Sequence, residues 1–102
     1  MGQSNGLEQQ DAEFIDQNQD KLIQRACGVD PILDQLLGLK VINAEEYSDI
    51  QVERTSQEKM RALLMGPMRA DGDSGKAKLY EILMKEQPHL MEDLQAASGN
   101  VR

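Results

Sequence analysis

The sequence predicts an all-α fold, arranged as a single antiparallel bundle of six short helices. Its 102 residues provide enough apolar surface for one hydrophobic core but not for two. Aromatic residues make up only 3% of the chain, so aliphatic side chains and methionine must fill that core, which suits helices better than a β-sandwich. Turn residues divide the chain into six amphipathic segments, and none of them has the alternating pattern of a strand.

The first two predicted helices lie on either side of Gly28. One covers residues 11–26, with acidic residues near its start and basic residues near its end, as the helix dipole favours. The next begins with Asp30 as N-cap and Pro31 at the first helical position, and it ends before Gly38. Together they offer these side chains to the core: Phe14, Ile15, Leu22, Ala26, Ile32, Leu33, Leu36 and Leu37.

The third and fourth predicted helices both begin with capping-box spacing. Asn43 precedes Glu46 by three residues, and Thr55 precedes Glu58 by the same distance. The fourth helix ends at Gly66 and Pro67. The predicted core residues of the two helices are Tyr47, Ile50, Met60, Leu63, Leu64 and Met68.

A predicted loop over residues 69–73 leads to the fifth helix, which begins at Ser74, and Pro88 opens a short sixth helix. Residues 1–10 are expected to be a disordered or expression-derived lead, residues 11–95 the domain, and residues 96–102 a flexible tail. These last helices are predicted to bury Leu79, Tyr80, Ile82, Leu83, Met84, Leu90, Met91 and Leu94.

The composition argues against several classes of function. The net charge of −7 disfavours nucleic acid as a partner, because such binders carry a basic surface. The chain has no apolar run long enough to span a membrane and no signal-peptide pattern, and its single cysteine, Cys27, suits a cytoplasmic protein. No cofactor, metal site or catalytic residue is predicted: His89 has no matching nucleophile, and the acidic residues 71–73 lack calcium-loop spacing.

The charges are divided unequally along the chain. Residues 1–53 contain 11 acids and 3 bases, whereas residues 54–102 contain 7 acids and 8 bases. Such runs are usually solvated helix faces. If the two sets lie on different sides of the bundle, however, the acids of one copy can meet the bases of the next in a head-to-tail contact.

A series of segments along residues 13–94 resembles the caspase-recruitment domain family, and most of all its inflammasome group of speck-forming adaptors and sensors with a function-to-find domain. The likeness rests on the ordered occurrence of core and cap positions rather than on one motif. Its segments are Phe14-Ile15-Asp16-Gln17, Leu22-Ile23-Gln24-Arg25, Val29-Asp30-Pro31-Ile32-Leu33-Asp34, Val41-Ile42 before Glu45-Glu46-Tyr47, Thr55 with Lys59-Met60-Arg61, and Pro88-His89-Leu90-Met91-Glu92-Asp93-Leu94.

This resemblance implies a six-helix death fold of Greek-key order with no enzymatic activity. Such a domain self-associates into filaments and recruits a caspase or adaptor that carries the same kind of domain. By position, Arg25 and Arg61 match the family's basic contact residues, and Asp30, Asp34 and Glu45 match its acidic ones. Local charge adds five further candidates for partner binding: Lys21, Arg54, Lys59, Glu46 and Asp49.

The sequence departs from the family pattern at three places. Gln19 replaces a basic residue, residues 69–73 lack the aromatic side chains found in the related adaptor, and Leu39 is a one-residue insertion after Gly38. Two alternatives to filament assembly stay open. The chain can be a monomeric acidic helical domain with a regulatory or binding role, or it can be the prodomain of a caspase.

Overall fold

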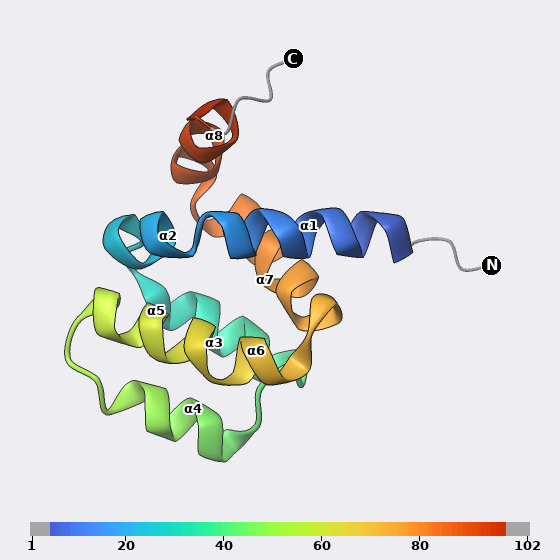
Figure 1. Cartoon of the computed structure of the whole chain (residues 1–102). Coiled ribbons are helices and arrows are strands. Elements are labelled where there is room, and N and C mark those ends of the chain that lie inside the picture. The colour runs from blue at the N-terminus through green and yellow to red at the C-terminus, as the bar shows by residue number, and fades with distance from the viewer. Residues whose placement is uncertain (1–4, 98–102) are drawn as a thin grey trace.

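A computed structural model describes residues 5–97, and every regular element in this range is an α-helix, as predicted (Figure 1). The described chain has eight helical segments rather than six. They are α1 Asn5–Gln17, α2 Gln19–Arg25, α3 Val29–Gly38, α4 Ala44–Gln51, α5 Ser56–Met65, α6 Pro67–Asp71, α7 Asp73–Glu86 and α8 Pro88–Ala97. The expectations for residues 1–4 and 98–102 lie outside the described residues.

The first predicted helix is interrupted at Asn18, which separates α1 from α2. The Asn18 backbone N–H donates to Phe14 O over 3.1 Å, and its side-chain Nδ2 donates to the same oxygen over 2.9 Å. This residue is only 6% exposed, so burial favours an amide that satisfies its own neighbouring backbone. The helix also starts earlier than predicted, because α1 begins at Asn5 instead of residue 11.

A second correction concerns residues 69–73, which were predicted to form a loop. Residues Pro67–Asp71 form the short helix α6 instead. Pro67 fits the first turn, where its missing N–H costs nothing, and the fully buried Met68 anchors the turn in the core. As a result α7 begins at Asp73, one residue before the predicted Ser74.

Helix starts with a capping box were predicted correctly. In α4, Glu46 N donates to Asn43 Oδ1 over 2.7 Å and Asn43 N donates to Glu46 Oε1 over 2.9 Å. The same reciprocal pair joins Thr55 and Glu58 at α5. Asp30 was predicted wrongly as the N-cap of α3, because Gly28, with φ of 61°, turns the chain into a helix that already begins at Val29.

The end of α3 is closed by a left-handed residue at Lys40, with φ of 65°. Val41 N donates to Leu36 O over 2.9 Å and Lys40 N donates to Leu37 O over 3.0 Å, which is the Schellman pattern. Gly38, where the sequence predicted the end of the helix, is still helical.

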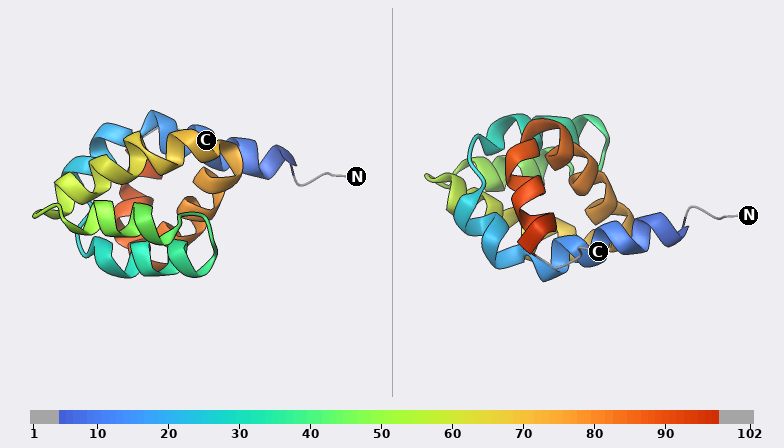
Figure 2. Two further views of the ribbon diagram at one scale, coloured as in Figure 1. Left: turned by 90° about the horizontal axis from the view of Figure 1, so that it is seen from below. Right: turned by 90° about the horizontal axis from the view of Figure 1, so that it is seen from above.

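The core lies where the helices meet, and the most extensive contact between two helices joins α1 and α7, which cross each other (Figure 1). α2 packs on α5, α3 on α4 and α7, and α8 on α7. Most predicted core residues are buried, but Met84 is 38% exposed, whereas Ile23, Val29 and Ile42 are buried without having been predicted. Views from below and above show the helices surrounding this shared centre (Figure 2).

Replacing Lys40 with glycine should stabilise the fold. A left-handed non-glycine residue costs about 1–2 kcal/mol, and the greater unfolded-state entropy of glycine offsets part of the gain, leaving about 0.5–1 kcal/mol. Thermal denaturation should therefore show a midpoint a few degrees higher. The same substitution at Leu39, whose φ is −84°, relieves no strain and should lower the midpoint. A lower midpoint for Lys40→Gly would contradict the assigned role of Lys40.

Candidate protein-interaction surface

Basic residues gather where α2 packs against α5. Lys21 and Arg25 are one turn apart on α2, and both are exposed. The two helices are joined by Gln57 Nε2, which donates to Gln24 O over 3.2 Å. Arg61 is exposed and lies one turn after Gln57, on the side of α5 that faces α2. We call Lys21, Arg25 and Arg61 the basic face; Arg54, also exposed, lies just before α5.

Acidic residues gather on the neighbouring pair α3 and α4. Asp30 and Asp34 are one turn apart and exposed on α3, and Glu45 is exposed in the first turn of α4. The Tyr47 hydroxyl of α4 donates to Asp34 Oδ1 over 2.5 Å and so ties the two helices together. We call Asp30, Asp34 and Glu45 the acidic face.

The hydrogen bond between Tyr47 and Asp34 also changes the titration of the tyrosine. The bond to the carboxylate holds the phenol in its neutral form and raises the pKa of Tyr47 above its ordinary value. Its hydroxyl therefore remains a donor to Asp34 throughout the neutral pH range. The Asp34 carboxylate is held in place with one oxygen engaged.

The structure places two predicted contact residues together within one molecule. Lys59 Nζ of α5 lies 2.9 Å from Asp30 Oδ1 of α3, and the lysine side chain is only 16% exposed while that of Asp30 is 61% exposed. Lys59 therefore does not extend the basic face but marks its border with the acidic face. Asp30 keeps most of its surface open to solvent.

A second ion pair joins the basic face to α8. Arg25 Nη2 lies 2.9 Å from Asp93 Oδ2, and both side chains are about half exposed, at 46% and 61%. Exposed pairs of this kind contribute about 0–1 kcal/mol to stability. Arg25 can therefore exchange Asp93 for another carboxylate at small cost.

Two of the predicted acidic residues lie on a separate surface. Glu46 and Asp49 line a groove between α4 and the junction of α5 and α6, together with Glu53, a residue that the sequence analysis did not select. The Glu46 side chain is already engaged in the capping box of α4. The structure thus divides the predicted acidic set between the acidic face and this groove.

The structure also shows where Cys27 and His89 lie. Cys27 is a free, exposed thiol, and His89 is exposed at the start of α8. Within residues 9–97, whose side chains are described, no group of three or more potential ligands is placed to hold a metal ion. No described helix combines the length and apolar character that crossing a bilayer requires.

Comparison with known proteins identifies the family of this chain. The model of the caspase recruitment domain, CARD, matches residues 12–97. The chain belongs to the CARD family. The resemblance inferred from its core and cap positions is therefore confirmed.

Two kinds of relative are similar to this CARD. Zebrafish apoptosis-associated speck-like protein containing a CARD is 46% identical over 84 residues, which are 82% of this chain and 41% of the relative. The rat NACHT, LRR and PYD domains-containing protein 1a (allele 1) and the mouse 1b (allele 1) are each 41% identical over 88 residues, which are 86% of this chain and 7% of the relative. The CARD thus spans less than half of each.

Replacing Asp34 with asparagine should lower the pKa of Tyr47 towards its ordinary value, because the charged hydrogen-bond acceptor is lost. Ultraviolet absorbance titration can measure this, since the chain has only two tyrosines. Tyr80, whose pKa is raised mainly by burial, provides an internal reference. Asp49→Asn removes an acid of the same helix, α4, that lines the separate groove and does not perturb Tyr47, so it should leave both titrations unchanged. Equal Tyr47 titrations in the two variants would contradict the assigned bond.

Proposed function

We propose that this CARD is a homotypic interaction module that assembles into signalling filaments and recruits a caspase or adaptor bearing the same kind of domain. The name of the zebrafish relative, apoptosis-associated speck-like protein containing a CARD, supports a role in apoptosis signalling. The resemblance of the chain to the inflammasome group of CARDs extends the proposal to inflammasome signalling, in which this domain would act without enzymatic activity. We further propose that α1 with α2, and α5 with α6, each correspond to one helix of a six-helix Greek-key death fold.

The observation that carries the proposal is the separation of charge between two pairs of helices. The view from below shows α2 and α3 at opposite edges of the molecule (Figure 2, left). The α2 part of the basic face and the α3 part of the acidic face therefore lie at different edges of the molecule, and the two faces border each other at the Lys59–Asp30 pair. The contact proposed here joins the basic face of one copy to the acidic face of the next, and such a contact propagates unless it closes into a ring.

The charged faces also determine which partners this module can bind and how salt affects the binding. Opposite charges steer two copies together and fix their orientation, while repulsion between like faces disfavours the wrong register. We propose other CARD-containing proteins and further copies of this chain as partners, in the cytoplasm, and neither nucleic acid nor a membrane. The interaction should weaken as salt rises, because the Debye length falls to about 8 Å at physiological ionic strength.

A monomeric regulatory domain is the second candidate, and the intramolecular ion pairs favour it. Lys59 is paired with Asp30 and Arg25 with Asp93, so part of the charge is already compensated in a single copy. However, Arg61 and Glu45 have no ion-pair partner within residues 9–97. Concentration-dependent assembly distinguishes the two functions.

Reversing one charge on either face should prevent assembly. Arg61→Glu and Asp34→Lys each place like charges opposite one another, and we expect the concentration at which filaments form to rise at least tenfold. The double variant restores an opposite-charge pair and should recover part of the assembly. Light scattering and negative-stain electron microscopy measure the threshold, and circular dichroism verifies the helix content.

Matched controls make the same charge changes elsewhere on the molecule. Glu92→Lys on α8 and Arg69→Glu on α6 alter exposed residues outside both faces and should leave the threshold within about twofold. If Arg61→Glu and Asp34→Lys assemble as the wild type does, the interface is wrong. A wild-type chain that stays monomeric at high concentration and low salt, and captures no other CARD, contradicts the proposed function as a whole.

A further inference from the structure

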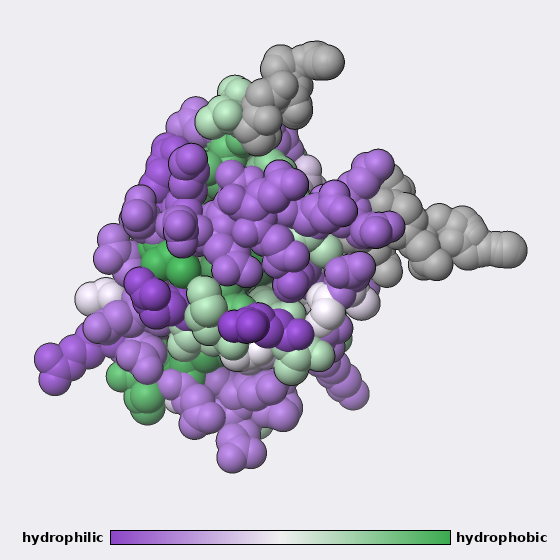
Figure 3. Space-filling view, viewed as in Figure 1, coloured by the Kyte–Doolittle hydropathy of each residue, from purple (hydrophilic) through white to green (hydrophobic). Residues whose placement is uncertain are grey.

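An exposed apolar side chain stands at the turn between α4 and α5. Val52 is 76% exposed, more than any other large hydrophobic residue among the described side chains. Figure 3 shows hydrophobic surface protruding at this end of α4. Neither the basic face nor the acidic face includes this residue, so the proposed function leaves it unexplained.

Hydrogen bonds hold the backbone around Val52. Glu53 N donates to Ile50 O over 3.0 Å, and Arg54 N donates to Glu58 Oε1 over 3.1 Å. The capping box of α5 follows directly. Val52 is thus presented in a fixed position, which lowers the entropy cost of inserting it into a partner.

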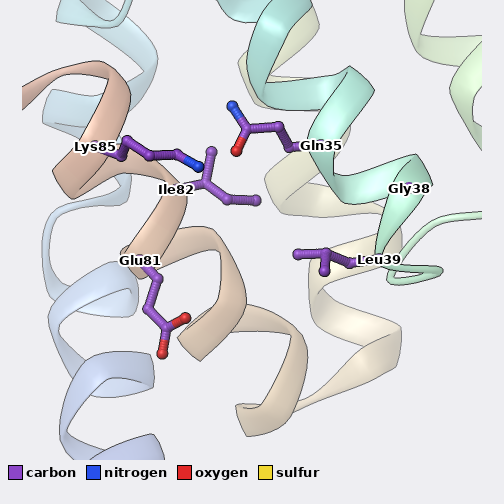
Figure 4. Close-up of a pocket in the computed structure, with 6 residues that line it drawn as sticks. All are labelled: Gln35, Gly38, Leu39, Glu81, Ile82 and Lys85. Carbon is purple, nitrogen blue, oxygen red and sulfur yellow. The ribbon is translucent and has the colours of Figure 1, made fainter.

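A groove of about 530 Å³ lies between α3 and α7. In Figure 4, Leu39 and Ile82 point into the space between the two helices, with the amine of Lys85 towards one end and the carboxylate of Glu81 towards the other. Leu39 is 52% exposed and forms an uncovered apolar wall of this groove, whereas Ile82, only 4% exposed, contributes its floor. The groove is therefore suited to a segment that carries an apolar side chain together with one acidic and one basic side chain.

The Val52 turn and this groove match in polarity and charge. Glu53 and Arg54 follow Val52 directly, and Lys85 and Glu81 stand one turn apart beside the apolar walls. No ion pair engages any of these four charged side chains within residues 9–97. With Val52 against Leu39 and above the buried Ile82, Glu53 can meet Lys85 and Arg54 can meet Glu81.

The two surfaces belong to opposite ends of the molecule. Figure 1 and the left view of Figure 2 both place the turn between α4 and α5 at one edge and the end of α3 at the other. A single copy therefore cannot fill its own groove with its own turn. A second copy can, and the contact is head-to-tail.

We propose that the Val52 turn of one copy docks into the groove between α3 and α7 of a second copy. This is a contact additional to the one between the charged faces, and it rests on the proposed self-association. Leu39, the inserted residue, forms one of its walls. Leu39 belongs to neither the basic face nor the acidic face, and the docking contact gives its exposed side chain a role.

Substitution of Val52 tests the contact in the full chain. Val52→Asp should raise the assembly threshold about tenfold or more, because a carboxylate would enter an apolar groove. Met65→Asp, which changes another exposed apolar residue outside the groove, should leave the threshold within about twofold. Glu53→Lys and Lys85→Glu should each weaken assembly as single variants. The double variant should recover assembly, because it restores an opposite-charge pair. Circular dichroism verifies that every variant keeps its helix content.

Site-specific crosslinking gives a readout that does not need filaments. In a Cys27→Ser background, Val52→Cys and Leu39→Cys chains are mixed under mild oxidation, and we expect a mixed disulfide dimer. Val52→Cys mixed with Gln24→Cys, at an exposed position on α2, should give at least tenfold less. Equal yields in the two mixtures, or Val52→Asp assembling like wild type while Arg61→Glu does not, would overturn the docking contact and leave the proposed function standing. If the crosslink between Val52→Cys and Leu39→Cys forms selectively but no filaments are seen, the docking contact is supported and the proposed filament assembly is contradicted.

Discussion

Burial of one apolar stripe from every helix in a single aliphatic core is the constraint on which the remaining structure depends. Short helices are unstable alone, so each must turn its leucine, isoleucine or methionine side chains towards the shared centre. That requirement fixes α2 on α5 and α3 on α4. The charges left on the outer sides of these pairs are then separated by the packing itself, and the basic and acidic faces follow from it.

The surface of one copy is already partly compensated. Lys59 and Asp30 pair across the border of the two faces, and Arg25 pairs with Asp93 at the outer edge. These contacts orient charged side chains before any partner arrives, and the exposed pair of Arg25 and Asp93 costs little to exchange, whereas the Lys59 side chain is only 16% exposed. Assembly on the proposed faces would therefore replace weak internal pairs with pairs between copies, which makes it sensitive to concentration and salt.

Local signals in the sequence were sufficient for much of the fold. The capping boxes at Asn43 and Thr55 and the proline at position 88 depend on spacing within one turn, and the buried stripes follow helical periodicity. The break at Asn18 was not predictable in this way, because the amide turns to its own backbone only when burial excludes water. Helix α6 depends similarly on the burial of Met68, which is decided by the other helices.

The sequence was enough to predict which charged residues are candidates for interaction, but not which of them lie next to one another in the folded chain. Charge counting found an acidic and a basic set, yet Lys59 and Asp30 are 29 positions apart in the sequence and only the folded chain shows that they pair. The separate groove that holds Glu46 and Asp49 depends likewise on how α4 meets α5 and α6. For the same reason Tyr47, which fixes Asp34, was expected only as a core residue.

An electron cryomicroscopy reconstruction of the assembled chain tests the central claim most directly, because it locates both faces of neighbouring copies at once. If the charged faces join the copies, Arg61 of one copy lies within about 4 Å of Asp34 or Glu45 of the next, a distance typical of an ion pair. A filament in which these residues face solvent, with neighbouring copies joined by other surfaces, would contradict the claim that charge separation between α2–α5 and α3–α4 drives assembly.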